Sequence, residues 1–218
     1  MFRSARRAVV FPQAEHARLA AAIAAVWGND EFPPPPVPFD SFVRGVALHD
    51  RGYGELDDDD LLGDIPVDRW LEIQRRGFQP SGGDPVVDLV VALHVRRLVG
   101  DSGDPDRAAL AQEFDAALPD LRAAAGAAAA EAAAADAITA FCDRIAFDFC
   151  VEEPAAGSVS VAGREIAYAI DGGGSMTLSP WPLGVARHAG VVTAFQAEGY
   201  PRKLDPVIVV FRVQPPST

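Results

Sequence analysis

The chain of 218 residues carries 31 acidic and 19 basic side chains, and its formal net charge of −12 offers no positive field to nucleic acid or anionic lipid. Its hydrophobic fraction of 49% and its two cysteines are typical of a globular protein and exclude the disordered and disulfide-scaffold classes. Since we find no apolar run long enough for a signal peptide or a membrane span, we expect a cytoplasmic protein that binds neither nucleic acid nor membrane.

The first third of the chain predicts two helices, a rigid connector and a polar loop. Apolar residues at three- and four-residue steps indicate an amphipathic helix over residues 13–27. The prolines at 33–36 form an extended connector, and a second helix with Asp40 as its N-cap leads directly to His49-Asp50. The glycines and aspartates of residues 51–64 predict a solvated loop, and function often lies in such loops.

Further helices are predicted in the middle of the chain. One runs from Pro66 to Gly77, and the next, over residues 86–99, is apolar almost all round apart from His94 and is therefore expected to be buried. A helical region then continues from Pro105 to Cys150. Pro119 is expected to kink or divide this region, because proline removes a hydrogen-bond donor and clashes with the preceding turn.

After Pro154 the pattern changes to the alternation of β-strands. Residues 158–161 and 165–170 alternate around a turn at Ala162-Gly163, which predicts a hairpin. Further strands are expected at 176–178, 191–196 and 207–213. We therefore predict a mainly α fold, in which a helical domain of residues 1–154 carries a small antiparallel β region, residues 155–218, that packs on it.

Three of the four histidines lie in the predicted helical part, and one of them precedes an aspartate. His49 and Asp50 offer an imidazole and a carboxylate from adjacent positions at a helix end. Both groups could turn toward one cation, and this donor pair suits Mn²⁺, Fe²⁺, Zn²⁺ or Mg²⁺. The dipeptide alone also fits a helix C-terminus followed by a turn.

The order of these residues adds to the signal. A histidine in one helix, His-Asp at the end of the next and an aspartate in a late helix resemble the HD-domain superfamily of metal-dependent phosphohydrolases. The resemblance implies an HD-like helical bundle and a divalent ion, Mn, Fe, Zn, Mg or Ni, held by His16, His49, Asp50 and Asp143. Asp148 competes with Asp143 for the last position.

A closer resemblance extends over nearly the whole chain. It is to a bacterial branch of unknown function that joins an HD-like core to a C-terminal β extension. The matching segments are QAEHARL from Gln13 to Leu19, VWG from Val26 to Gly28, HDRGY from His49 to Tyr53, FCD from Phe141 to Asp143, and PWP from Pro180 to Pro182.

His94 has two interpretations, because an imidazole in an apolar helix needs a partner when it is buried. It is either a hydrogen-bonded core histidine or part of the site, as a second metal ligand or a group that faces a phosphate. If His94 completes a second metal site, the resemblance also implies a di-iron oxygenase. A non-catalytic binding or scaffold protein, free of metal and inactive, is the third hypothesis.

The leading hypothesis is hydrolysis of a phosphoester in a small phosphorylated metabolite or nucleotide. Asp50 would act at the metal, and Tyr53 and Glu55 lie just beyond it in sequence, where Glu55 either accepts a proton or is a solvated loop residue. The predicted contacts to the substrate phosphate are Arg18, Arg51 and Arg96. We expect a small anionic molecule as the partner, and a homodimer is kept open.

Overall fold

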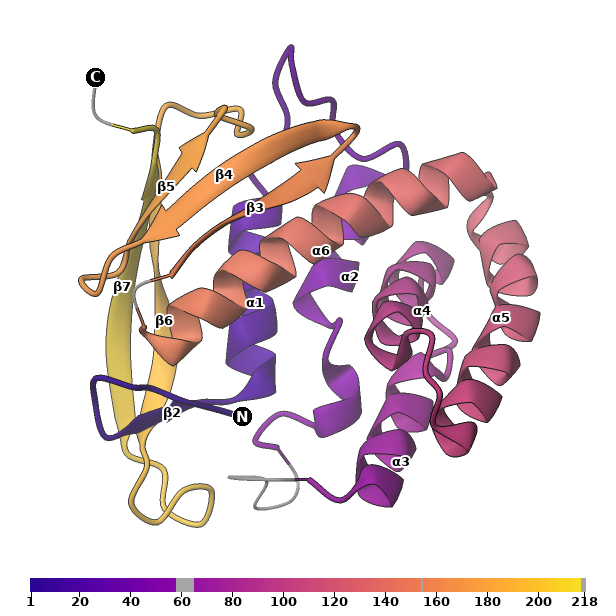
Figure 1. Cartoon of the computed structure of the whole chain (residues 1–218), viewed down its shortest axis with the longest axis horizontal. Coiled ribbons are helices and arrows are strands. Elements are labelled where there is room, and N and C mark those ends of the chain that lie inside the picture. Colours follow the sequence, from indigo (N-terminus) through magenta and orange to yellow (C-terminus); the bar gives the residue numbers. More distant parts are fainter. Residues whose placement is uncertain (58–64, 154, 217–218) are drawn as a thin grey trace.

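The computed structural model describes residues 1–57, 65–153 and 155–216, and within them the helices and the strands gather on opposite sides of the molecule (Figure 1). The α-helices are α1 (Gln13–Ala24), α2 (Phe39–Ala47), α3 (Val67–Phe78), α4 (Pro85–Val99), α5 (Pro105–Ala125) and α6 (Ala129–Val151), and a short 3₁₀ helix, η1 (Arg51–Tyr53), follows α2. The sequence predicted helical structure for all six α-helices, and the spacing of apolar positions indicated α1 and α2. In contrast, η1 lies in a segment that was predicted to be a loop.

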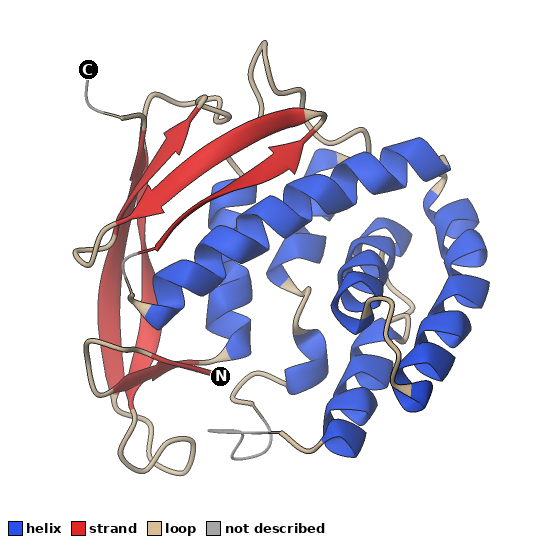
Figure 2. Ribbon diagram, viewed as in Figure 1, coloured by secondary structure: helices blue, strands red, loops and turns tan. Residues whose placement is uncertain are grey.

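The strands form one curled sheet. They are β1 (Phe2–Arg3), β2 (Val9–Phe11), β3 (Ala155–Val161), β4 (Arg164–Ile170), β5 (Ser175–Ser179), β6 (His188–Gln196) and β7 (Pro206–Gln214). Their order is β1-β2-β6-β7-β5-β4-β3, in which β5 and β7 pair in parallel and the other neighbours pair antiparallel. The seven strands curl into a half-barrel that covers one side of the helices (Figure 2).

The predicted fold class, a mainly α HD-like bundle with a small antiparallel β region, is wrong. Of the described residues, 46% are helical and 21% lie in strands of a seven-stranded mixed sheet. The sheet is larger than expected because it also recruits the N-terminal segment, where β1 pairs with β2 and β2 pairs with β6 through Val9 and Gln196. Strands of two or three residues, such as β1 and β2, are too short to show a period in the sequence.

The main hydrophobic core lies between the sheet and two helices. α1 and α6 lie next to the sheet, whereas α3, α4 and α5 lie on the far side (Figure 1). Phe11 of β2, Phe149 of α6 and Phe211 of β7 are all buried in this core. A second cluster joins α3, α4 and α5, where the rings of Phe78 and Phe114 stack 3.9 Å apart.

The long helical region after Pro105 is divided at Gly126 and not at Pro119. Pro119 lies inside α5, on its exposed side. Proline has no N–H to donate to the carbonyl of Asp115, but Asp115 is also exposed, so water can take the place of that donor. Gly126 ends α5 in the left-handed conformation, with φ of 65°. In the described part of the chain, none of the helices has the length and apolar character that crossing a membrane requires.

Candidate metal centre

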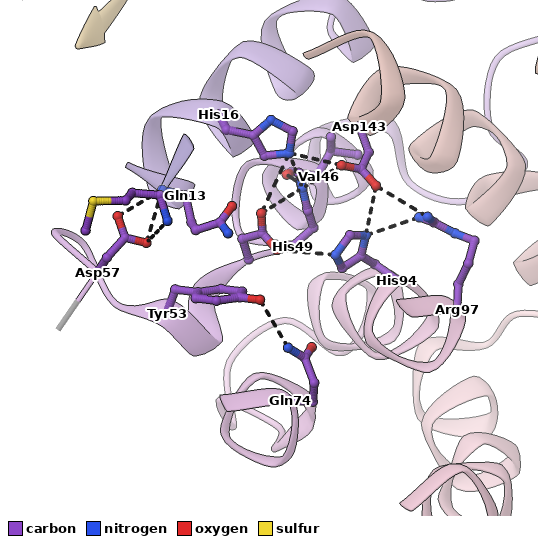
Figure 3. Close-up of polar contacts among 12 residues, drawn as sticks. Gln13, His16, Val46, His49, Tyr53, Asp57, Gln74, His94, Arg97 and Asp143 are labelled. Atoms are coloured by element: carbon purple, nitrogen blue, oxygen red, sulfur yellow. Dashed lines mark hydrogen bonds and ion pairs between the residues drawn. The ribbon is translucent and has the colours of Figure 1, made fainter. Parts of the chain in front are cut away.

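Four helical segments bring three histidines and two aspartates into one buried cluster. His16 comes from α1, His49 and Asp50 from the turn between α2 and η1, His94 from α4 and Asp143 from α6. Figure 3 shows the side chains of His16, His49, His94 and Asp143 pointing toward one another. The three histidine rings are at most 1% exposed, and Asp50 is 7% exposed. The structure thus brings together all five residues that the sequence predicted as metal ligands.

The turn that carries His49 and Asp50 is held by backbone packing. Gly52 in η1 lies against α3, where an added Cβ atom would approach the carbonyl oxygen of Ile73 to 2.4 Å. Only glycine allows η1 to approach α3 this closely. The His49 Nδ1 atom lies 2.6 Å from the carbonyl oxygen of Val46, and because a carbonyl only accepts, Nδ1 carries the proton. In neutral His49 the Nε2 lone pair therefore faces the cluster.

The donor atoms converge at distances that fit one coordinated cation. His16 Nε2 lies 3.2 Å from His49 Nε2, 3.0 Å from Asp143 Oδ1 and 3.7 Å from Asp50 Oδ2. His49 Nε2 lies 3.4 Å from Asp50 Oδ2 and 3.5 Å from Asp143 Oδ1. Atoms about 2.1 Å from one metal ion are about 3.0 Å apart at the edges of an octahedron and about 3.4 Å apart at those of a tetrahedron.

The electrostatics of the cluster also favour a cation. Burial alone would lower the pKa of His49, but the charge of Asp50 and the hydrogen bond to Asp143 outweigh it and raise the pKa to about 10. Burial alone would raise the pKa values of Asp50 and Asp143. The neighbouring imidazoles outweigh burial and hold both pKa values well below the usual range of a carboxyl group. Two ionised carboxylates and two imidazoles, without a thiolate, are a donor set for Mn²⁺, Fe²⁺, Zn²⁺ or Ni²⁺.

His94 lies between Asp50 Oδ1 and Asp143 Oδ2, one oxygen from each carboxylate. Its Nε2 atom is 3.3 Å from Asp50 Oδ1, and its Nδ1 atom is 3.5 Å from Asp143 Oδ2. Arg97 Nη2 lies 3.1 Å from Nδ1, and because a guanidinium only donates, Nδ1 is the acceptor and Nε2 bears the proton. Burial and the charge of His49 lower the pKa of His94, in agreement with a neutral ring.

A pocket of about 360 Å³ opens beside the cluster. Its walls include the aromatic rings of Phe2, Trp70 and Phe147 and the side chain of Tyr53. The Tyr53 hydroxyl accepts a hydrogen bond from Gln74, and burial raises its pKa, so it remains a neutral donor. A larger apolar groove of about 550 Å³ lies between the α3–α4 connection and α5. None of the five cluster residues lines this groove.

The three predicted phosphate contacts do not line this pocket. Arg18 pairs with Glu15 and Glu55 at the surface. Arg18, Arg51 and Glu55 instead line a separate hollow of about 210 Å³, which Asp50 also lines. Arg51 donates to Asp88 and to the carbonyl of Gly77. Arg96 pairs with Asp101 and Asp115. Of the predicted substrate and catalytic residues, Asp50 and Tyr53 line the pocket.

Two arginines that sequence reasoning missed do line it, Arg97 and Arg144. Arg97 follows His94 by three residues, the spacing that places both on one face of α4, whereas Arg96 faces elsewhere. That spacing was the signal that could have identified Arg97. Asp148, the alternative last ligand, accepts hydrogen bonds from Tyr168 and Arg144 and does not join the cluster.

Comparison with protein families gives one match. Residues 2–192 match the family described as "Protein of unknown function (DUF3891)". No curated protein and no solved structure matches the chain.

Proposed function

The chain belongs to the DUF3891 family, and we propose from its own site that it is a divalent-metal-dependent phosphohydrolase for a small phosphorylated metabolite or nucleotide. The observation that carries this proposal is the convergence of two imidazoles and two carboxylates, 3.0–3.7 Å apart in the measured pairs, at the wall of a pocket that also holds two arginines. The pocket offers positive charge and aromatic surface side by side, which favours an anion that carries an apolar or planar group.

We propose further that this family is a branch of the HD-domain superfamily. The support is the order of the ligands, with His16 in α1, His49-Asp50 after α2 and Asp143 in α6. These residues match the ligand positions of that superfamily, and their side chains converge in space. The half-barrel that wraps α1 and α6 is an addition to such a helical core.

His16, His49, Asp50 and Asp143 would hold the cation. When bound, a divalent cation supplies a Lewis acid that lowers the pKa of water and neutralises charge on a phosphate group. His94 Nε2 lies 3.3 Å from Asp50 Oδ1, where its proton would help to orient that carboxylate. The neutral Tyr53 hydroxyl can donate a hydrogen bond to a substrate oxygen, and Phe2, Trp70 and Phe147 give the pocket apolar walls.

The test is elemental analysis of protein purified without added metal or chelator. We expect about one equivalent of metal per chain for one such site. A His49→Ala/Asp50→Ala variant should lose the metal and any phosphatase activity toward a panel of phosphomonoesters. His188→Ala is the matched control, because His188 lies on β6 outside the cluster. Absence of metal in the wild-type protein, even after reconstitution, would contradict the proposal and favour the scaffold hypothesis.

One observation bears on the oxygenase alternative. His49, Asp50 and His94 form a second group with ligand atoms within 4.8 Å of one another. The guanidinium of Arg97 contacts His94 there, and its positive charge opposes a second cation. Two equivalents of iron per chain, with visible absorbance and dioxygen consumption, would favour the oxygenase over the hydrolase.

A further inference from the structure

We propose that Arg144 is the residue that binds the anionic group of the substrate, and that Asp148 and Tyr168 are positioning residues that hold its guanidinium at the pocket. This inference rests on the proposed function, because it assigns the substrate-binding role within the same site. It begins with the face of α6 that lines the pocket. Ala140, Asp143, Arg144 and Phe147 follow one another at the spacing of one helix face, and all four line the pocket.

The orientation of Arg144 is set by two buried side chains. Its Nε atom lies 3.1 Å from Asp148 Oδ2 and 3.1 Å from the Tyr168 hydroxyl oxygen, and both oxygens accept from it. The Tyr168 hydroxyl donates to Asp148 Oδ2 at 2.7 Å and closes the triangle. Asp148 and Tyr168 are 6% and 5% exposed, whereas the Arg144 side chain is 56% exposed. The anchor is therefore rigid and the guanidinium is open to a ligand.

This anchor uses only one of the three nitrogen atoms of Arg144. Within the described residues, its Nη1 and Nη2 atoms have no hydrogen-bond partner. The Phe147 ring lies 5.9 Å from the guanidinium carbon and supports its plane. Two parallel N–H groups on a fixed plane are the arrangement that binds a phosphate or carboxylate through two hydrogen bonds.

The other arginine of the pocket is already engaged. Arg97 donates through Nε to Asp136, through Nη1 to Asp143 and through Nη2 to His94. All three of its nitrogen atoms are therefore engaged, two of them with His94 and Asp143 of the cluster. Of the two guanidinium groups that line the pocket, Arg144 is the one whose Nη1 and Nη2 atoms both have no hydrogen-bond partner among the described residues.

The sheet is built to hold this anchor. Tyr168 lies on β4 and pairs in register with Gly157 of β3. An added Cβ atom at Gly157 would come within 2.9 Å of the Tyr168 hydroxyl oxygen. Glycine at this position leaves room for the tyrosine to reach across to α6. The half-barrel thus contributes a side chain that orients a pocket residue.

The experiment titrates inorganic phosphate into Mn²⁺-loaded protein by calorimetry, for the wild type and for Arg144→Gln, Arg144→Lys, Tyr168→Phe and Asp148→Asn. We expect Arg144→Gln to weaken phosphate binding about tenfold or more, since a hydrogen bond to a charged group is lost. Arg144→Lys should recover part of the affinity, because it restores charge without the planar pair of donors. Tyr168→Phe and Asp148→Asn should weaken phosphate binding severalfold while Mn²⁺ stoichiometry is unchanged.

Arg96→Gln is the matched control, because Arg96 lies two residues from His94 yet pairs outside the pocket and should bind phosphate as the wild type does. Wild-type phosphate affinity in Arg144→Gln, with Mn²⁺ binding intact, overturns the inference and leaves the proposed function standing. Phosphate affinity unchanged in Tyr168→Phe and Asp148→Asn, with only the melting temperature lowered, overturns their positioning role. If the wild type binds no metal but binds phosphate through Arg144, the hydrolase is refuted and the anion site is retained.

Discussion

At the scale of single residues, Asp84 links the two helices that lead to the candidate metal centre. Its carboxylate caps α4 by accepting from the amide of Val86 at 2.9 Å. It also accepts a hydrogen bond from Ser41 at 2.6 Å and pairs with Arg44, both on α2. Because α2 leads to His49 and α4 carries His94, this one side chain fixes the start of both segments relative to each other.

We predict that Asp84→Ala lowers the free energy of unfolding by more than the loss of a helix cap alone. Loss of an N-cap costs about 1 kcal/mol, and the contacts to Ser41 and Arg44 add to it. Asp104→Ala is the matched control, because Asp104 caps α5 through the amides of Asp106 and Arg107 and, among the described residues, its carboxylate makes no hydrogen bond to another helix. Urea unfolding measures both variants, and equal losses would contradict the inter-helical role of Asp84.

The same residue predicts a dependence of stability on pH. The hydrogen bond from Ser41 is the largest of the effects that lower the pKa of Asp84 in the folded protein. A carboxyl group with a lowered folded pKa stabilises the fold above its unfolded pKa of about 3.9, and this contribution is lost as the pH falls through the folded pKa. The difference in unfolding free energy between wild type and Asp84→Asn should therefore be constant from pH 7 to 5 and shrink below about pH 4. A constant difference down to pH 3 would contradict it.

At the scale of elements, the crossing of α2 and α4 depends on Gly45. A Cβ atom added there would lie 2.6 Å from Cβ of Val90. We predict that Gly45→Ala costs about 1–3 kcal/mol, as overpacking in a close-packed interior does, and weakens Mn²⁺ binding because it displaces His49 from His94. Gly103→Ala, where nothing lies within 4 Å, is the control and should be near neutral. Thermal unfolding and a Mn²⁺ titration test this, and unchanged metal affinity would show that the crossing does not position the site.

A helix or strand could be predicted from the sequence where its own apolar residues repeat with a helical or strand period. The apolar positions of α1 and α2 repeat with the helical period, and the alternation around Gly163 predicted the β3–β4 hairpin, so these were found. β2 exists because β6, nearly two hundred residues away in sequence, supplies its hydrogen-bond partner, and β1 in turn pairs with β2. No local pattern encodes such a pairing, so tertiary contacts decided the extent of the sheet.

In the candidate site, too, local sequence identified some residues and tertiary packing decided others. The spacing of His16, His49-Asp50 and Asp143 and the resemblance it carries identified residues that lie together in the structure. Which aspartate of α6 would join them could not be decided, because Asp143 and Asp148 differ only in the helix face they occupy. That face is set by how α6 packs between α1 and the sheet. The choice of Arg96 over Arg97 was different, since helical geometry relative to His94 could have corrected it.

At the scale of the whole molecule, the core does not follow the predicted boundary between residues 154 and 155. Phe11 and Phe149 lie before it and Phe211 after it, and the three are buried in one cluster. We predict that a chain of residues 1–154 does not fold cooperatively, because it exposes the apolar faces of α1 and α6 that the sheet covers. Circular dichroism during thermal unfolding tests this, and a sharp transition in the shortened chain would instead support two independent domains.

Metal binding should stabilise the molecule as one unit. The ligands come from α1, the α2–η1 turn and α6, and α1 and α6 also pack against the sheet, so a cation held by His16, His49, Asp50 and Asp143 binds the native state alone. At 100 times its dissociation constant, Mn²⁺ should add about 2.7 kcal/mol to the free energy of unfolding. For a chain of this size that raises the melting temperature by about 5–10 °C. Calorimetry should show a single transition that shifts as a whole, returns on addition of chelator, and does not shift in His49→Ala/Asp50→Ala.

Arg144→Gln should keep the full shift, because Arg144 contacts no ligand atom of the cluster. Two transitions of which Mn²⁺ moves only one would show that the sheet and the helices unfold separately, and no shift in the wild type would show that the cluster holds no cation.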